Sequence, residues 1–279
     1  MYARLFILIF LSFLIFHSKV QAQQLSQEAT FSILTCNPGE EVYSMYGHTA
    51  IRVSDPQQDL DVVFNYGVFS FETPNFLYRF AKGQTDYLMV GQKFGSFLPE
   101  YVEDKRSVYE QVLNLSPEGK TKLFQTLIEN AKPENREYRY NFFIDNCATR
   151  VRDMIERNAG SPVRFTDNHP TESYRDLIKK FHHSLRWTDL GIDLLIGKKA
   201  EEPVSAYGQM FLPEYLMDQF ARAEINFDGK TQPLALETRT LLEYHNSKLN
   251  NGLPWPAIVF GLFFLIVAGI SVRAYLLKK

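Results

Sequence analysis

The sequence contains few residues of the types that bind metals. It has two cysteines, Cys36 and Cys147, and six histidines in 279 residues. There is no Cys-x-x-Cys pair and no His-Glu-x-x-His motif, and the histidines are mostly isolated. The ligand spacing of a zinc site is therefore missing, and we expect neither a metal nor another cofactor.

Basic residues are also scarce between the two ends of the chain. Five of the 30 lysines and arginines lie in the terminal segments described below, namely Arg4, Lys19, Arg273, Lys278 and Lys279. The remaining 25 stand against 32 acidic residues, a formal charge of −7. The sequence has no run of like charges, no repeat and no low-complexity tract. Nucleic acid is therefore not an expected partner.

Both ends of the chain are apolar. Residues 1–22 combine an early arginine, an apolar stretch over 5–16 and small residues before position 22, the layout of a secretory signal. Residues 257–277 carry a single charge, and about 20 apolar residues cross a bilayer as a helix. We expect a transmembrane helix over 254–277, with Trp255 at the interface.

Charge placement predicts the orientation of this helix. Arg273, Lys278 and Lys279 lie at the end of the apolar span, so the positive-inside rule predicts a cytoplasmic tail at 278–279. Residues 23–250 would then form an extracytoplasmic domain, with a core over about 30–160 and a helical elaboration over about 161–245. In a bacterium this predicts the inner (cytoplasmic) membrane, with the domain in the periplasm.

The pattern of apolar residues predicts an α+β domain. Branched and aromatic residues indicate strands at 30–35, 48–53, 60–69, 85–92 and 107–115. The second and third of these are joined by a short polar turn and most simply form an antiparallel hairpin. Helices are expected over 74–82, from Ser116 to Pro133, and from residue 147 to Gly160.

Cys147 lies in the motif NFFIDNCATRVRDMIE, residues 141–156. Asp145 or Asn146 can cap the helix that follows, which places Cys147 in its first turn. The free N–H groups and the helix dipole at that position favour an anion and are expected to lower the thiol pKa. Such a cysteine is a candidate nucleophile if an imidazole can accept its proton.

Among the histidines, His48 is the candidate base. It follows a glycine at the start of an apolar strand, whereas His182 and His183 lie in a polar stretch and the other histidines of the domain in loop-like contexts. A third group should orient its ring, and Asn65 is preferred over the alternative Asp61. The oxyanion donors would be the backbone N–H of Cys147 and a polar neighbour, drawn from Tyr43, Tyr46 and Asn146.

The blocks LTCNPGEEVYSMYGHTAIRV, FNYGVFSFETPNFLYRFAKGQTDY, YRYNFFIDNCATRVRD and QMFLPEYL together resemble a known family. The order of histidine before cysteine is similar to the circularly permuted papain-like (NlpC-like) group that includes lecithin:retinol acyltransferase. More closely, the blocks resemble the periplasmic domain of the Lnb-type bacterial lipoprotein N-acyltransferases, formerly of unknown function. The likeness spans residues 30–216. A single C-terminal span departs from the pattern of larger members.

This resemblance implies a fold and a reaction. The fold would be a permuted papain-like α+β domain with an antiparallel sheet and a helix that bears the nucleophile. Cys147 would take a fatty acyl chain from a phospholipid as a thioester, with His48 as the base. The amine of a diacylglyceryl-cysteine lipoprotein would then accept the chain. The expected partners are this phospholipid donor, the diacylated lipoprotein and the bilayer.

Two other interpretations stay open. The same Cys-His pair could serve a peptidoglycan amidase or endopeptidase of NlpC-like type. Alternatively, Cys36 and Cys147 could form a disulfide in a tethered binding module, since exported proteins meet oxidising conditions. Residues 189–197 and 210–214 could form helices packed on the core, a cap over the site or a docking surface for the bilayer. Residues 246–252 read as a flexible tether.

Overall fold

A computed structural model of the chain describes residues 25–69, 74–75, 79, 82–166, 172–182, 186–245 and 253–277. The expected signal at 1–22, the tether at 246–252 and the tail at 278–279 lie outside the described residues. Most of the helix expected at 74–82 also lies outside them.

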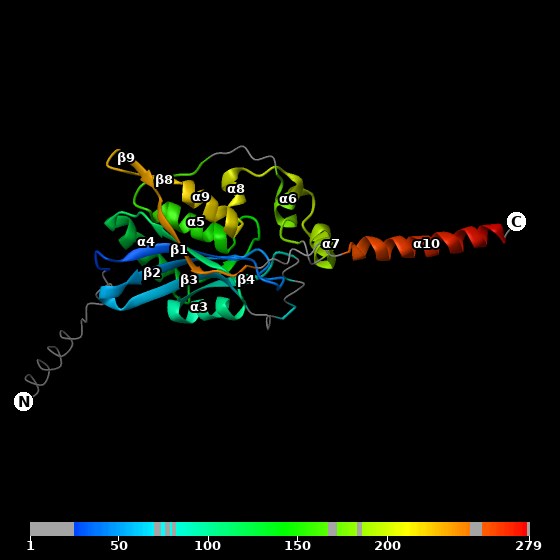
Figure 1. Ribbon diagram of the computed structural model, residues 1–279, viewed down its shortest axis with the longest axis horizontal. Helices are drawn as coiled ribbons and strands as arrows, with labels where there is room; N and C mark the ends of the chain where they lie inside the picture. Colours follow the sequence, from blue (N-terminus) through cyan, green and yellow to red (C-terminus); the bar gives the residue numbers. More distant parts are fainter. Residues whose placement is uncertain are drawn as a thin grey trace, which may run out of the picture.

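A seven-stranded antiparallel sheet forms the centre of the domain (Figure 1), which confirms the predicted α+β class and antiparallel sheet. Its order is β10-β5-β1-β2-β3-β4-β6. The expected hairpin is β2–β3, joined by the short 3-10 helix η1 (Pro56–Gln58). The strands are β1 (Thr30–Cys36), β2 (His48–Asp55), β3 (Leu60–Val68), β4 (Asp86–Lys93), β5 (Val108–Leu113), β6 (Glu137–Arg139) and β10 (Ala235–Leu242).

Helices cover both faces of this sheet (Figure 1). Because side chains alternate between the faces of a strand, Ala50 of β2 packs against α3 (Phe94–Glu103), whereas its neighbour Ile51 packs on the opposite side. That opposite face is covered by α4 (Pro117–Asn130), α5 (Cys147–Asn158) and α9 (Pro213–Arg222). The largest of the three apolar clusters lies between these helices and the sheet.

The helix α5 begins and ends where the sequence predicts. Ala148, Val151 and Ile155 repeat every three or four positions and are fully buried against the sheet. This spacing puts them on one helical face. The helix ends just before Gly160, whose positive φ of 82° suits a residue without a side chain. Burial of this face fixes α5, and Cys147 with it, over the middle strands.

The C-terminal part of the domain is more mixed than the helical elaboration expected for about 161–245. It contains α6 (Tyr174–Lys179), α7 (Arg186–Leu195), η2 (Lys198–Glu201), α8 (Ala206–Gln209) and α9. It also contains a small antiparallel sheet of β7 (Val163–Arg164), β8 (Glu224–Phe227) and β9 (Lys230–Pro233). In addition, β10 pairs with β5, so this part completes the main sheet. The region thus combines the expected helices with strands that the sequence did not indicate.

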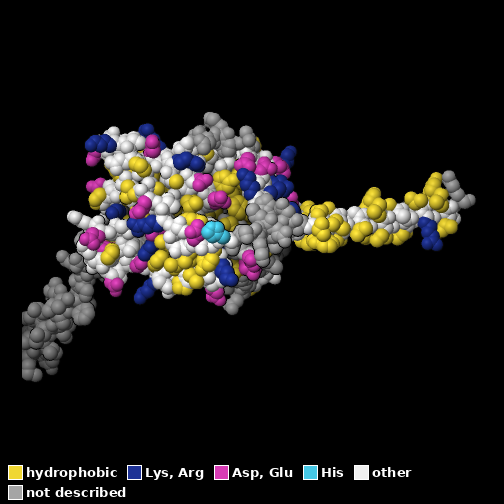
Figure 2. All heavy atoms as spheres, viewed as in Figure 1, with side chains coloured by type: hydrophobic (Ala, Val, Ile, Leu, Met, Phe, Trp, Pro, Cys, Tyr) yellow, Lys and Arg dark blue, Asp and Glu magenta, His cyan; other side chains and the backbone are white. Residues whose placement is uncertain are grey.

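Among the described residues, one helix is long and apolar enough to cross a membrane, by its length and composition. This is α10 (Trp255–Leu276), which has 22 residues and no buried side chain. It extends away from the domain (Figure 1), and hydrophobic side chains cover it along its length (Figure 2). Its bounds agree closely with the expected span at 254–277.

Candidate functional site

Asn146 begins α5 and holds Cys147 in the first turn. Its side-chain oxygen accepts hydrogen bonds from the backbone N–H groups of Ala148 and Thr149, both at 2.9 Å. In return, Thr149 Oγ1 accepts from the N–H of Asn146 at 2.8 Å, which completes a capping box. Of the two caps that the sequence allowed, Asn146 is therefore the one used.

The amide nitrogen of Asn146 ties this helix start to two other segments. Nδ2 donates to the carbonyl oxygens of Phe142 at 2.7 Å and Phe211 at 2.8 Å. The side chain is only 2% exposed. Both of its N–H groups are engaged, so Asn146 positions the helix and is not a free oxyanion donor, contrary to the sequence-based expectation.

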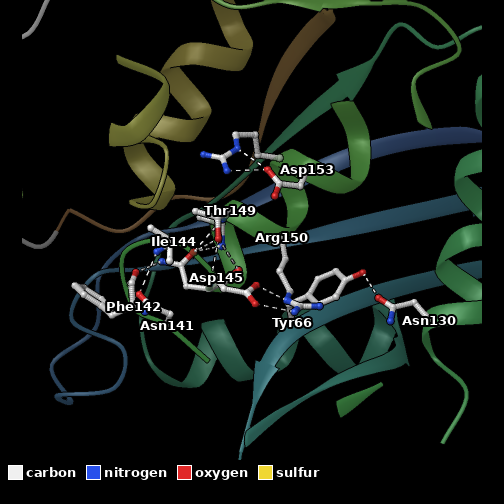
Figure 3. Close-up of polar contacts among 12 residues, drawn as sticks. Tyr66, Asn130, Asn141, Phe142, Ile144, Asp145, Thr149, Arg150 and Asp153 are labelled. Carbon is white, nitrogen blue, oxygen red and sulfur yellow. Dashed lines mark hydrogen bonds and ion pairs between the residues drawn. The ribbon is translucent and has the colours of Figure 1, made fainter. Parts of the chain in front are cut away.

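Asp145 supports the same turn through Arg150. The guanidinium donates from Nε and Nη2 to the two carboxylate oxygens, at 2.6 and 2.9 Å. Figure 3 shows this pair beside Tyr66, and the Arg150 guanidinium also lies over the Tyr138 ring, 3.6 Å from its centroid. Asp145 therefore does not cap α5, although the sequence allowed it. It instead forms an ion pair with Arg150, whose guanidinium also stacks on an aromatic ring.

The sulfur of Cys147 lies against the end of the sheet. Backbone N–H groups of Thr49, Ala148 and Cys147 itself donate toward it. Gly67 of β3 adjoins it, because a Cβ placed on Gly67 would be 3.6 Å from the Cβ of Cys147. The thiol therefore sits where the start of β2, which carries His48, meets the end of β3.

Burial has a larger effect on the pKa of the Cys147 thiol than these N–H donors have. Desolvation raises the pKa of Cys147 above its ordinary value, although the three backbone N–H groups act in the opposite direction. The expected lowering of the thiol pKa by the helix start was wrong in its net sign. The free site therefore holds a neutral thiol at neutral pH.

The structure brings His48 and Asn65 together. His48 Nε2 lies 3.1 Å from Asn65 Oδ1. An amide oxygen can only accept, so Nε2 carries the proton and Nδ1 keeps its lone pair as a base. Asp61 is used elsewhere, since its carboxylate binds the Arg52 guanidinium with two contacts of 2.8 Å. Of the two alternatives for orienting the imidazole, only Asn65 contacts it.

The imidazole is neutral in this environment. Burial lowers the pKa of His48 to about 4, aided by the positive charge of Arg106, while the contact with Asn65 acts in the opposite direction. The site thus pairs a neutral thiol with a neutral imidazole. Such a pair suits proton transfer during nucleophilic attack rather than a preformed thiolate.

A cleft of about 500 Å³ opens beside His48 on the face covered by α3. It is lined by both polar and aromatic side chains, and it reaches Gly67, which adjoins Cys147 on its other side. His48 and Asn65 line it together with Tyr43, Phe69, Phe97 and Tyr101. A substrate in this cleft would contact the imidazole directly, whereas Cys147 is not among the residues that line it.

The two tyrosines proposed as oxyanion donors have different surroundings. Tyr43 is 62% exposed at the rim of the cleft, with its ring edge against Phe69. The hydroxyl of Tyr46 instead lies 2.6 Å from His182 Nε2. Burial, and after it the charge of Asp189, raise the pKa of Tyr46 above its ordinary value. The Tyr46 hydroxyl is thus hydrogen-bonded to His182 and is not free to bind an oxyanion.

His182 and Asp189 are connected to the site through Tyr46, and the sequence did not reveal this connection. His182 is buried, and its Nδ1 lies 2.7 Å from Asp189 Oδ1. Because the carboxylate accepts, Nδ1–H donates to Asp189 and Nε2 accepts from Tyr46. His182 lies in the polar stretch Lys-Phe-His-His-Ser, and no spacing in the sequence links it to Tyr46, 136 positions away.

Cys36 and Cys147 are both free thiols. Cys36 is buried in the cluster beneath α3, and burial raises its pKa to about 12. The disulfide alternative is therefore not what the structure shows. Among the described residues, no group of three His, Cys, Asp or Glu side chains is placed to hold a metal ion.

No match was found among curated proteins or among solved structures. A comparison with protein-family models matched residues 17–180, more than half of the chain, to the Lnb N-terminal periplasmic domain. The matched segment contains the capped Cys147, the His48–Asn65 pair and Tyr46. The chain therefore belongs to the Lnb family and carries its periplasmic N-terminal domain.

Proposed function

We propose that this protein is a membrane-anchored cysteine acyltransferase of permuted papain-like fold. It would move a fatty acyl chain from a phospholipid to the N-terminal amine of a diacylglyceryl-cysteine lipoprotein. One observation carries the proposal: Cys147 at the start of a capped helix abuts the strand end that holds His48, and His48 is oriented by Asn65. Family membership supports the same assignment.

In the first half-reaction, Cys147 Sγ attacks the ester carbonyl carbon of the phospholipid. His48 Nδ1 takes the thiol proton and delivers it to the departing lysophospholipid oxygen, which leaves an acyl thioester on Cys147. The backbone N–H of Cys147, at the start of α5, lies beside the reacting sulfur and is the donor proposed for the oxyanion, because the N–H groups of Ala148 and Thr149 already bind the cap.

In the second half-reaction, the lipoprotein amine attacks the thioester carbonyl carbon. His48 accepts the amine proton and returns it to the leaving sulfur, so an amide forms and the thiol is regenerated. The neutral imidazole required at both steps is the form that burial favours at neutral pH.

The proposed topology places both substrates within reach. We propose that α10 spans the inner membrane with its C-terminus in the cytoplasm, after an N-terminal signal at 1–22 has exported the domain. Both lipid substrates would lie in the outer leaflet of that membrane. A tether raises the effective concentration of the domain at this surface.

Intact-protein mass spectrometry tests the proposal. The detergent-purified protein is incubated with phospholipid, alongside Cys147→Ala, His48→Ala and Asn65→Ala. We expect a hydroxylamine-sensitive gain of one acyl chain, absent from Cys147→Ala and strongly reduced in His48→Ala. Transfer of that chain to a synthetic diacylglyceryl-cysteine peptide then tests the acceptor.

Asp61→Asn is the matched control, because it breaks the pair with Arg52 but leaves His48 and Asn65 in contact. It should form the adduct at nearly the normal rate, whereas Asn65→Ala should not. Absence of any adduct, together with release of peptide fragments from peptidoglycan, would replace this proposal with the amidase alternative.

A further inference from the structure

The helix α7 has an inward face built from acidic and apolar residues. Asp189 contacts His182 at 2.7 Å. Asp193 pairs with Arg175 Nη1 at 2.5 Å and Lys179 Nζ at 3.1 Å. Ile192 packs against the apolar cluster below. These positions share one helical face, so both carboxylates of α7 are turned toward the domain, where Asp189 accepts a hydrogen bond and Asp193 is paired with two cations.

The outward face of the same helix is apolar. Trp187, Leu194 and Leu195 are 51%, 77% and 64% exposed. With both acidic residues turned inward, this face presents no carboxylate to its surroundings. Large apolar side chains gathered on one exposed face indicate an interaction site rather than ordinary surface.

The position of α7 identifies what covers this face. α7 lies beside the start of α10 (Figure 1) and contacts it, with the rings of Trp187 and Phe260 6.1 Å apart between centroids. Phe260 follows Trp255 by five residues, which is about 7.5 Å along a helix. A helix lying in a membrane interface buries its apolar face about 5–10 Å deep. Phe260, and Trp187 beside it, would therefore lie at the depth at which an interfacial helix buries its apolar face.

We propose that α7 is a membrane-surface helix, with Trp187, Leu194 and Leu195 inserted into the bilayer that α10 spans. This inference rests on the membrane anchoring proposed above, but not on the acyl-transfer reaction. We favour the bilayer over a protein partner for two reasons. The exposed face of α7 is continuous with the start of α10. It also consists of one aromatic ring and two leucines, with no charged group.

Two membrane contacts would restrict the orientation of the domain more than a single contact can. The inward face of α7 also leads to the site, because Asp189 holds His182 and His182 holds Tyr46, two residues before His48. The membrane-surface helix is thus joined by hydrogen bonds to the segment that carries the candidate base.

The two tryptophans of the chain allow a direct test. Trp255→Phe leaves Trp187 as the single tryptophan, which can be excited selectively, and Trp187→Phe leaves Trp255 at the start of α10 as the reference. Both variants carry Cys147→Ala, so no acyl chain can be transferred from the lipid used. Each full-length protein is placed in phosphatidylcholine vesicles with and without bromine near the upper part of the acyl chains.

We expect Trp187 emission to shift to shorter wavelength in vesicles and to be lost on brominated lipid, as for Trp255. Leu194→Ser with Leu195→Ser should restore most of the Trp187 emission. Leu236→Ser is the matched control, because Leu236 is 61% exposed on β10 and should change nothing. Circular dichroism confirms that the variants are folded.

Three results would overturn the proposal. Trp187 could remain open to quenching by aqueous iodide and insensitive to bromine while Trp255 is quenched, so that the face is in water. It could be shielded from both quenchers, which would identify a protein partner or a second copy. It could also be quenched by bromine equally in the double serine variant, which would show proximity to α10 without insertion of α7.

Discussion

The hydroxyl oxygen of Tyr46 lies 2.6 Å from Nε2 of His182, although 136 residues separate them in the chain. Tyr46 is followed by Gly47 and then His48. Gly47 has a φ of +83°, and a Cβ there would lie 2.6 Å from the carbonyl oxygen of Cys36. The backbone between Tyr46 and His48 is therefore closely confined, and the Tyr46–His182 contact fixes one end of it.

Tyr46→Phe should slow acylation of Cys147 while keeping the ring contacts of Tyr46. The change leaves the buried His182 Nε2 without its partner, which should lower the free energy of unfolding by about 1–3 kcal/mol. A small displacement of His48 should reduce the acylation rate by about tenfold or more. Rates from intact-mass time courses and thermal unfolding measure the two effects.

Tyr215→Phe is the control for this substitution. Its hydroxyl accepts a hydrogen bond from Lys180 Nζ at 2.8 Å at the surface of the same region. Surface changes of this kind usually alter stability by less than about 0.5 kcal/mol. If Tyr46→Phe acylates Cys147 as fast as Tyr215→Phe does, the Tyr46–His182 contact has no role in positioning His48.

The reactivity of Cys147 should rise with pH without an early plateau. Burial raises its pKa above the ordinary value of 9.0, so the thiolate forms only at higher pH and is lost as pH falls. The alkylation rate with chloroacetamide should therefore increase about tenfold per pH unit from 7 to 9, following the thiolate fraction. No inflection is expected near pH 6.5, because His48, with a pKa of about 4, is already neutral there.

These rates are measured in a Cys36→Ala background, so that the buried Cys36 cannot contribute. A rate that is already maximal at pH 6 and constant up to pH 8 would indicate a preformed thiolate–imidazolium pair. It would contradict the neutral pair described here.

Gly67 should not tolerate a side chain. Its φ is +93°, a conformation that costs an L-residue about 1–2 kcal/mol. Gly67→Ala should lower stability by about that amount and slow acylation, because relief of the strain would move the end of β3 beneath Cys147. Unfolding measurements and the mass-spectrometric acylation assay report the two effects.

Gly91→Ala offers a comparison within the same sheet. A Cβ at Gly91 meets Phe64 Cε1 at 3.5 Å, an ordinary contact, and Gly91 does not have a positive φ. Its replacement should be close to neutral and should leave acylation unchanged. Equal effects at Gly67 and Gly91 would argue against a special role for the conformation of Gly67.

The sequence predicted the parts of the fold in which local pattern and tertiary burial agree. β1, β2, β3 and α5 have clear periodicity and recognisable boundaries, and they bring Cys147 and His48 to one end of the sheet. The predicted pairing of the second and third strands offered Asn65 and Asp61 for the imidazole. In the structure Asn65 lies opposite Ala50, two residues after His48, which brings it within reach of the ring.

The parts that were missed lack a local signal. The strand β10 is an edge strand with mostly exposed side chains, so it has no apolar alternation. The helix α3 contains Pro99 and begins without a side-chain cap, although Phe97 and Tyr101 are buried beneath it. His182 becomes buried only through contacts between distant segments. The net rise of the Cys147 pKa likewise depends on burial that the helix-start motif does not encode.

Asn146→Ala should destabilise the domain more than the loss of an ordinary helix cap. The substitution removes the acceptor for Ala148 and Thr149, and it leaves the buried carbonyl oxygens of Phe142 and Phe211 without their donor. Together these losses should lower the free energy of unfolding by about 2–4 kcal/mol. Acylation of Cys147 should fall as well, since the first turn of α5 loses its attachment. Ser116→Ala removes a cap of the same kind from α4, where Ser116 accepts from Gly119 alone, and should cost only about 1 kcal/mol.

Asn146→Asp separates the two functions of the side chain. An aspartate keeps the oxygen that caps α5 but places a second oxygen toward the carbonyl oxygens of Phe142 and Phe211, where Nδ2 donates in the native protein. We therefore expect Asn146→Asp to be nearly as harmful as Asn146→Ala, in both unfolding and acylation. If Asn146→Asp instead behaves like the native protein, capping alone accounts for Asn146, and the hydrogen bonds to Phe142 and Phe211 do not hold Cys147 in place.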